Sequence, residues 1–82
     1  MATFTVLYRH PYHLREGAHY TVDRPSAEIA GKEAADMLPY DLSPDDEPEY
    51  LELESIRDDL EIKVYEGVHS AQPEGQPAYE FL

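Results

Sequence analysis

The chain has 82 residues, no cysteine and a formal net charge of −12, which arises from 18 acidic and six basic side chains. A chain this short forms one domain, here residues 1–82, and buries too little surface to enclose a deep catalytic pocket. The lack of cysteine excludes disulfides, thiolate nucleophiles and thiolate metal ligands. No basic and apolar leader follows Met1, and no apolar run approaches the roughly 20 residues of a membrane helix, so we expect a cytoplasmic protein.

Negative charge is concentrated in the second part of the chain. Residues 1–32 carry four basic and three acidic side chains, a sum of +1, whereas residues 33–82 carry two basic and fifteen acidic ones, a sum of −13. Within one domain, this distribution predicts a near-neutral surface beside a strongly anionic one. Such a field repels nucleic acid and anionic membranes, so we expect the partner to be a basic protein surface.

Two strands are predicted at the start of the chain. Residues 3–8 alternate between apolar and polar side chains, and residues 19–23 repeat the pattern over a shorter run. Pro11 and Gly17 predict a loop, or the frayed end of a hairpin, over residues 9–17. The side chains expected on the buried face are Phe4, Val6, Tyr8, Tyr20 and Val22.

A single helix is predicted near residues 26–38. Ser26 is the expected N-cap, and Glu28 lies in the first turn, where the helix dipole favours a carboxylate. Pro39 is expected to end the helix, because proline lacks a backbone N–H and clashes with the preceding turn. Gly31 weakens the helix slightly but permits close packing on a sheet. The apolar stripe comprises Ala30, Ala34, Met37 and Leu38, with Ile29 at its edge.

The stretch that follows the acidic loop fits two structures. One is a β-hairpin with strands at residues 50–56 and 60–65, turning around residues 58–59. The other is a helix. Strict alternation over residues 60–65 favours a strand there, and we expect the hairpin for the whole stretch. The apolar residues that the rival helix would bury are Leu53, Ile56 and Leu60.

These elements predict an α+β fold with the order β-β-α-β-β, in which one helix packs on one face of an antiparallel sheet. A polar linker over residues 67–77 then leads to residues 78–82, which are apolar enough to form a short final edge strand.

The predicted hairpin carries a row of carboxylates on the face opposite Leu51 and Leu53. Side chains two residues apart on a strand lie ~6.6 Å from each other, whereas duplex DNA carries one charge per ~1.7 Å of axis, so the row imitates DNA only coarsely. We expect this surface to occupy a basic groove that binds nucleic acid. The alternative is a charged, solvated sheet face that keeps the protein soluble. The predicted partner-binding residues are Asp45, Asp46, Glu47, Glu49, Glu52, Glu54, Asp58, Asp59 and Glu61.

The segment between the first two strands offers a rival binding surface. Residues 8–15 are aromatic, basic and irregular, and tyrosine and arginine are frequent hot-spot residues of interfaces. The alternative is that Tyr8 packs in the core and the rest is an exposed loop. The rival partner-binding residues are Arg9, His10, Tyr12, His13 and Arg15.

Metal-binding and catalytic patterns are incomplete. Residues 41–52 resemble a calcium-binding loop in the spacing of their oxygen ligands, but Asp46 stands where such a loop needs glycine. A zinc site is also unfavoured, because Pro11 interrupts the histidine cluster and no His-Glu-x-x-His helix is present. No serine lies in a nucleophile elbow. We therefore expect no catalytic residues, no metal and no cofactor. The candidate zinc ligands are His10, His13, His19 and Glu16.

Several features together resemble a known class of protein: the 82-residue length, the strands at residues 3–8 and 19–23, the Ser26-capped helix and the acid-rich segment 45–66. In outline, the chain resembles the small acidic proteins that phages and mobile elements use against bacterial defences, anti-CRISPR proteins in particular. The resemblance implies a stoichiometric inhibitor in the host cytoplasm that blocks DNA from reaching a CRISPR surveillance complex. It assigns no role to any single residue, because the members of this class differ in fold and target.

Two other functions stay open. The chain fits an accessory interaction module that binds through the N-terminal Tyr/His/Arg loop, or that forms a homo-oligomer through the edge at residues 79–82. It also fits, less well, a small metal-dependent enzyme built on His10, His13 and nearby acids.

Overall fold

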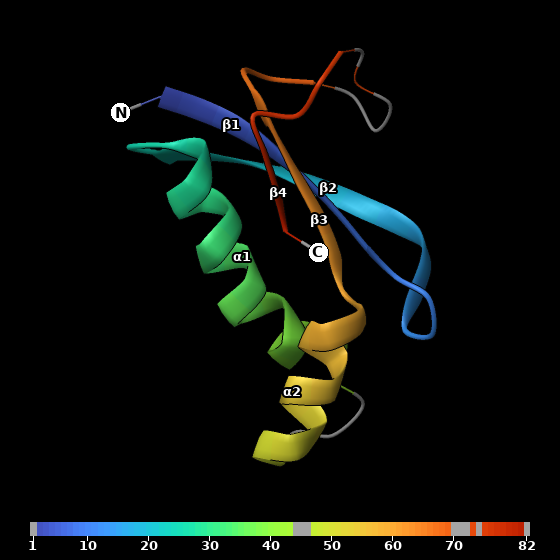
Figure 1. Ribbon diagram of the computed structural model, residues 1–82. Coiled ribbons are helices and arrows are strands. Elements are labelled where there is room, and N and C mark those ends of the chain that lie inside the picture. The colour runs from blue at the N-terminus through green and yellow to red at the C-terminus, as the bar shows by residue number, and fades with distance from the viewer. Residues whose placement is uncertain (1, 44–46, 70–72, 74, 82) are drawn as a thin grey trace.

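A computed structural model of the chain describes residues 2–43, 47–69, 73 and 75–81. This part of the chain forms four strands and two helices (Figure 1). In chain order they are β1 (Ala2–His10), β2 (Leu14–Arg24), α1 (Ala27–Leu42), α2 (Tyr50–Asp59), β3 (Glu61–Glu66) and β4 (Tyr79–Phe81). The strands form one antiparallel sheet in the order β2-β1-β3-β4. The predicted α+β class is confirmed, but the order is β-β-α-α-β-β, with a second helix where a strand was expected.

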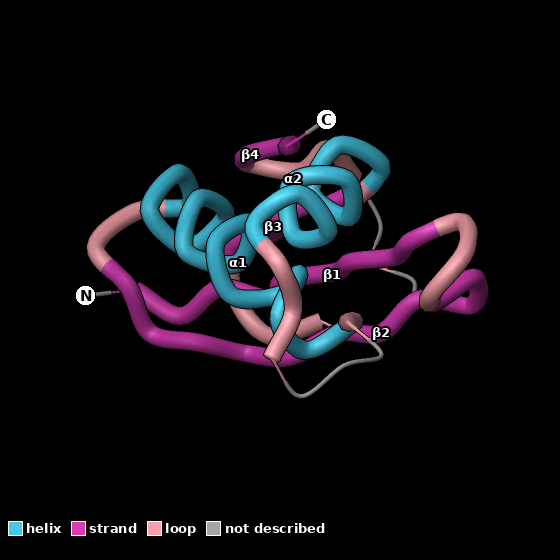
Figure 2. The backbone as a smooth tube through the Cα atoms, turned by 90° about the horizontal axis from the view of Figure 1, so that it is seen from below, coloured by secondary structure: helices cyan, strands magenta, loops and turns pink. Residues whose placement is uncertain are grey.

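The core lies between α1 and one face of the sheet. Helix α1 covers this face, and α2 packs against α1 beyond the end of the sheet (Figure 1). Strand β2 forms one edge of the sheet and β4 the other (Figure 2). Alternation along β1 and β3 sends every second side chain into the core, as expected for a half-buried sheet. None of the described helices is long and apolar enough to cross a membrane. The buried core comprises Phe4, Val6, Ala30, Ala34, Ala35, Leu38, Leu60, Ile62 and Val64.

The first hairpin extends further than the sequence predicted. Residues 9–17 were expected to form a loop or the frayed end of a hairpin, and the turn itself occupies only residues 11–13. His10 pairs with Leu14 and Tyr8 with Ala18, so three residues of β2 face Arg9 alone. This bulge absorbs Gly17, whose φ of 77° lies in the left-handed region that glycine tolerates. Pairing therefore continues past the glycine, and the second alternative, the irregular end of a hairpin, describes this segment.

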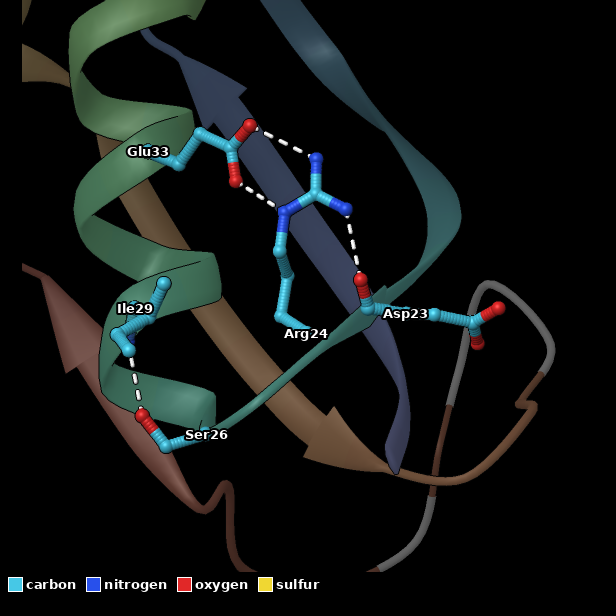
Figure 3. A network of polar contacts seen from close by, with 5 residues as sticks. All are labelled: Asp23, Arg24, Ser26, Ile29 and Glu33. Carbon is cyan, nitrogen blue, oxygen red and sulfur yellow. Dashed lines mark hydrogen bonds and ion pairs between the residues drawn. The ribbon is translucent and has the colours of Figure 1, made fainter. Parts of the chain in front are cut away.

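Helix α1 begins as predicted. The hydroxyl oxygen of Ser26 accepts a hydrogen bond from the backbone N–H of Ile29 at 3.3 Å (Figure 3). Arg24, at the end of β2, donates two hydrogen bonds to the carboxylate of Glu33, one of them 2.8 Å long (Figure 3). The first turns of the helix are therefore fixed to the adjoining strand.

Helix α1 does not end at Pro39, which corrects the prediction. It runs on to Leu42, with Pro39 inside it. Proline has no N–H to donate to the carbonyl four residues earlier, here that of Ala35. The Nε atom of Arg57 donates to this carbonyl instead, at 3.3 Å. A side chain from the next helix thus satisfies the carbonyl that Pro39 leaves open.

Residues 50–59 form helix α2 rather than the first strand of a hairpin. The helical spacing of apolar residues predicted this helix correctly, because Ile56 and Leu60 are buried, at 3% and 1% exposed. The alternation at Leu51 and Leu53 was misleading, since Leu51 is 73% exposed. The predicted hairpin is wrong, and so is the row of strand carboxylates that depended on it. The second predicted strand is confirmed as β3.

The short C-terminal strand is confirmed as β4, which pairs with β3 at Ile62, Lys63 and Val64. Gly31 of α1 permits its close packing, as expected. A Cβ atom on Gly31 would lie 2.2 Å from the ring of Tyr79, so only glycine leaves room for that ring. Leu82, which was predicted to belong to this strand, lies outside the described residues.

Candidate functional site

The acidic residues predicted to bind a partner are gathered on and beside α2. Glu47 and Glu49 precede the helix, whereas four others lie within it and Glu61 opens β3. Asp45 and Asp46 lie outside the described residues. The four helical carboxylates are those of Glu52, Glu54, Asp58 and Asp59, which we call the α2 acids.

Helical geometry divides the α2 acids into two groups. Glu54 and Asp58 are four residues apart and share the outward face with Leu51, on the side opposite Ile56. Glu52 and Asp59 lie along the flank of the helix nearer to Ile56. The α2 acids therefore wrap around the solvent side of one short helix, in place of the flat row that a strand would present.

The α2 acids form none of the ion pairs found among the described residues. Four ion pairs are formed there: Arg9 with Glu61, Arg24 with Glu33, Lys32 with Glu28, and Arg57 with Asp36. Among these pairs, none involves the α2 acids, Glu47 or Glu49. Arg57, the cation of α2 itself, points to α1. The helix thus presents a net negative face to solvent.

Several charged side chains of α2 lie at positions where they destabilise the helix. Glu54 and Asp58 are like charges at the i,i+4 spacing, which repel. Asp58 and Asp59 lie in the last turn, where the helix dipole disfavours carboxylates. Glu49, the N-cap, makes no capping hydrogen bond with its side chain. Packing of Ile56 and the two contacts of Arg57 with α1 hold the helix in place.

The start of α2 also exposes apolar surface. Tyr50 and Leu51 are 77% and 73% exposed. In Figure 1 this end of the helix projects past the end of α1, away from the sheet. An acidic helix with exposed Tyr and Leu combines the charge and the apolar anchors that protein interfaces use.

The rival surface is the turn between β1 and β2. Tyr12 at its tip is 75% exposed, and His13 and Arg15 are exposed beside it. His10, in contrast, is only 1% exposed, so it lies beneath the surface rather than on it. Its Nδ1 atom accepts hydrogen bonds from the backbone N–H groups of Tyr12 at 3.1 Å and His13 at 3.2 Å. His10 therefore shapes the turn that presents its neighbours.

The two predicted surfaces meet in one place. A cleft of about 590 Å³ lies between the β1–β2 turn and the end of α2, and residues of both surfaces line it. Arg9 and Glu61 form an ion pair on its wall, and the hydrogen bond from Arg9 lowers the pKa of Glu61. We call this the turn–helix cleft. Its charged lining comprises Arg9, Arg15, Asp58, Asp59 and Glu61.

Among the described residues, no group of three or more histidine, aspartate or glutamate side chains is placed to hold a metal ion. Of the calcium-loop residues, Asp41 ends up on α1 and Glu52 on α2. Of the candidate zinc ligands, His10 uses Nδ1 within its own turn. The expectation that the protein holds no metal stays a prediction.

Sequence reasoning missed two features of the site. Arg57 was not singled out, although a proline inside a helix signals a carbonyl that needs another donor. The open face of the sheet was also missed. This face carries a depression of about 510 Å³ near Leu7, Ala18 and Lys63. Next to the depression, Gly67 and His69 cover the face and form hydrogen bonds with the Thr5 hydroxyl. Strand alternation alone does not reveal which face a linker covers.

Comparisons with protein-family models, with curated protein sequences and with solved structures each found no match to the chain. Function must therefore be inferred from the residues and their geometry.

Proposed function

We propose that the protein is not an enzyme but a binding protein whose α2 acids contact a basic surface of a partner protein. The observation that carries this function is the placement of these carboxylates. They lack ion-pair partners among the described residues, and three of the four, Glu54, Asp58 and Asp59, sit where they weaken their own helix. Charge needed only for solubility has no reason to be concentrated there, since it serves as well on any exposed strand or loop.

The partner that fits is a groove lined by lysine and arginine, such as one that binds nucleic acid. A helix rises 1.5 Å per residue, so Glu54 and Asp58 present carboxylates ~6 Å apart along the axis. Successive charges on one strand of duplex DNA lie ~3.4 Å apart along the axis, so this pair of carboxylates imitates a row of phosphates only coarsely. Occupying the groove excludes the nucleic acid, which makes the protein an inhibitor. A CRISPR effector complex is one such partner, in line with the resemblance of the chain to anti-CRISPR proteins.

The binding test removes three charges at a time. Partners are captured from bacterial lysate at low salt, identified, purified, and then measured for their association rate with three forms of the protein. The test variant is Glu54→Gln, Asp58→Asn and Asp59→Asn, whose side chains are all exposed. The matched control is Glu16→Gln, Glu66→Gln and Glu80→Gln, which removes the same charge from other exposed positions.

The test variant is expected to associate roughly tenfold more slowly at low salt, with the difference shrinking as salt is added, while the control changes little. Equal slowing by both triple variants would mean that only total charge matters. If the test variant associated as fast as the parent, α2 would not be part of the binding surface.

A second candidate function uses the β1–β2 turn, because Tyr12 is 75% exposed at its tip and the turn borders the same cleft. Changing Arg9 and Tyr12 to alanine removes its two main contact groups. A partner that loses affinity for this variant alone binds the turn and not α2. A partner that bridges the cleft loses affinity for both variants.

A further inference from the structure

One edge of the sheet is left open. Strand β2 pairs only with β1, over residues 2–8 of β1 and 18–24 of β2, and its other side has no strand neighbour among the described residues (Figure 2). The opposite edge is different, because β4 is only three residues long. A short edge strand offers few backbone groups to another chain, whereas β2 offers a run of seven residues.

The open run of β2 lacks the features that usually block edge pairing. Residues 18–22 carry no formal charge and no proline, and they include the β-formers Tyr20, Thr21 and Val22. Blocking features stand only at its ends: the bulge at Gly17 on one side and Pro25 on the other. These ends define the length of a strand that can be added, from residue 18 to residue 24.

Charge indicates that the added strand comes from a second copy. The hairpin Ala2–Arg24 carries three arginines against Glu16 and Asp23, a sum of +1, in a protein of net charge −12. Two copies repel each other least when they approach through these hairpins. The carboxylates of β3 and β4, including Glu61 and Glu80, then lie on the far sides of the two sheets.

We propose that two copies of the chain pair antiparallel through residues 18–24 of β2, forming one continuous sheet across a two-fold axis. In a symmetric pair, a residue that faces another is faced by it in return. With Thr21 opposite itself, His19 faces Asp23 of the second copy, and Tyr20 faces Val22. The first contact joins a donor to a carboxylate. The second joins two half-buried side chains that already pack on the core.

The alternative register, with Tyr20 opposite itself, is less favourable. It pairs only residues 18–22, because the bulge at Gly17 would then lie opposite Asp23. The Thr21-centred register pairs all of residues 18–24 and therefore forms the longer ladder.

Cross-linking tests both the edge and its register, and the chain suits it because it has no cysteine. Directly opposed residues on antiparallel strands have Cβ atoms ~4.5–5.5 Å apart, just beyond the ~3.5–4.5 Å that a disulfide spans, so a small shift of the strands lets Thr21→Cys oxidise to a covalent dimer. Ser55→Cys, at an exposed position of α2, is the control for random collision. Equal rates of dimer formation by the two variants would overturn the pairing.

Sedimentation equilibrium of the cysteine-free protein supplies a second readout. We expect the parent to reach twice the mass of one chain with rising concentration. Thr21→Lys should stay at the mass of one chain, because two lysines would meet at the axis, while Ser55→Lys should behave as the parent. A parent that stays monomeric throughout, or a Thr21→Lys variant that dimerises as the parent does, contradicts the dimer. Neither result depends on whether the α2 acids bind a partner.

Discussion

At the scale of single residues, His10 has an unusual environment. Its ring is buried, and Nδ1 accepts two backbone hydrogen bonds, so the neutral ring carries its proton on Nε2. That Nε2 atom has no hydrogen-bond partner among the described residues. Protonation would place a hydrogen on Nδ1, where it would face the N–H groups of Tyr12 and His13. Burial and the neighbouring His13 lower the pKa of His10 below 6.5, opposed by Asp59 and the Ile56 carbonyl.

The lowered pKa predicts how stability depends on pH. The unfolded chain binds a proton at His10 more readily than the folded one, so folding is favoured at high pH. The contribution of neutral His10 to the free energy of unfolding is fully present above pH 6.5. It is lost as the pH falls through the pKa that His10 has in the folded protein, which lies below 6.5. Urea unfolding of the parent and of His10→Asn, whose side-chain oxygen can accept the same turn bonds, measures this contribution. The parent should lose stability relative to the variant as the pH falls below about 6.5.

The control for this measurement is Ser55→Asn, because Ser55 is exposed on α2 and does not titrate. It should retain the pH slope of the parent. Carboxylates also titrate at the acid end, but they are common to all three proteins and cancel in the comparison. If the free energy of unfolding changed with pH in the same way for the parent and for His10→Asn, protonation of His10 would leave the turn undisturbed.

Arg57 is the second residue with a specific structural role, and Pro39 explains why. With Pro39 present, removal of Arg57 leaves the carbonyl of Ala35 without a donor. We expect Arg57→Ala to lower the free energy of unfolding by about 1–3 kcal/mol, because a part-buried carbonyl loses its hydrogen bond from a charged donor. In a Pro39→Ala background the backbone N–H of residue 39 supplies the missing bond, so the same change should cost clearly less. Urea unfolding of the four proteins of this double-mutant cycle gives the difference.

Asp36→Asn is the control for the cycle. It removes the exposed ion pair with Arg57 while leaving the bond to Ala35, and it should cost less than about 1 kcal/mol. If Arg57→Ala costs the same with and without Pro39, the two residues are not coupled through that carbonyl.

At the scale of elements, α2 separates what local sequence can predict from what it cannot. The strand at residues 3–8, the Ser26 cap and β3 follow from alternation and capping, which act within a few residues. Helix α2 does not, because residues 50–60 support both a strand and a helix. Its outcome depends on burial of Ile56 and on Arg57 reaching α1, and these contacts exist only in the folded protein. The same contact lets α1 continue past Pro39.

The candidate site followed the same division. The acidic composition of residues 45–61 was evident from the sequence, but its geometry depended on the misassigned hairpin. The cleft that joins Arg9 and Arg15 to Asp58 and Asp59 brings together segments about forty residues apart. Without the fold, the two surfaces could only be treated as rivals.

The charges of α2 predict a gain in stability when they are removed. The Glu54→Gln, Asp58→Asn and Asp59→Asn variant loses an i,i+4 repulsion and two unfavourable dipole interactions, so its free energy of unfolding should rise by about 0.5–1 kcal/mol. Thermal unfolding at low and high salt measures this, and the gain should shrink with salt. The Glu16, Glu66 and Glu80 variant should gain less. A test variant less stable than the parent would show that these carboxylates support α2 instead of weakening it.

At the scale of the whole molecule, the charge is divided between its parts. The hairpin Ala2–Arg24 sums to +1, while residues 33–82 sum to −13 and include α2 and the acidic lining of the turn–helix cleft. The open edge of β2 and the α2 acids are therefore two surfaces of different chemistry on one small domain. One suits a second copy of the chain, and the other suits a basic partner.

Amide hydrogen exchange of the protein, alone and bound to its captured partner, locates the binding surface directly. Helix α2 is short, carries repulsive charges and exposes its first residues, so its amides should exchange readily in the free protein. In the complex, the amides of Tyr50–Asp59 and those bordering the turn–helix cleft should become protected. Protection confined to other segments, with α2 exchanging as fast as it does in the free protein, would contradict binding through the α2 acids.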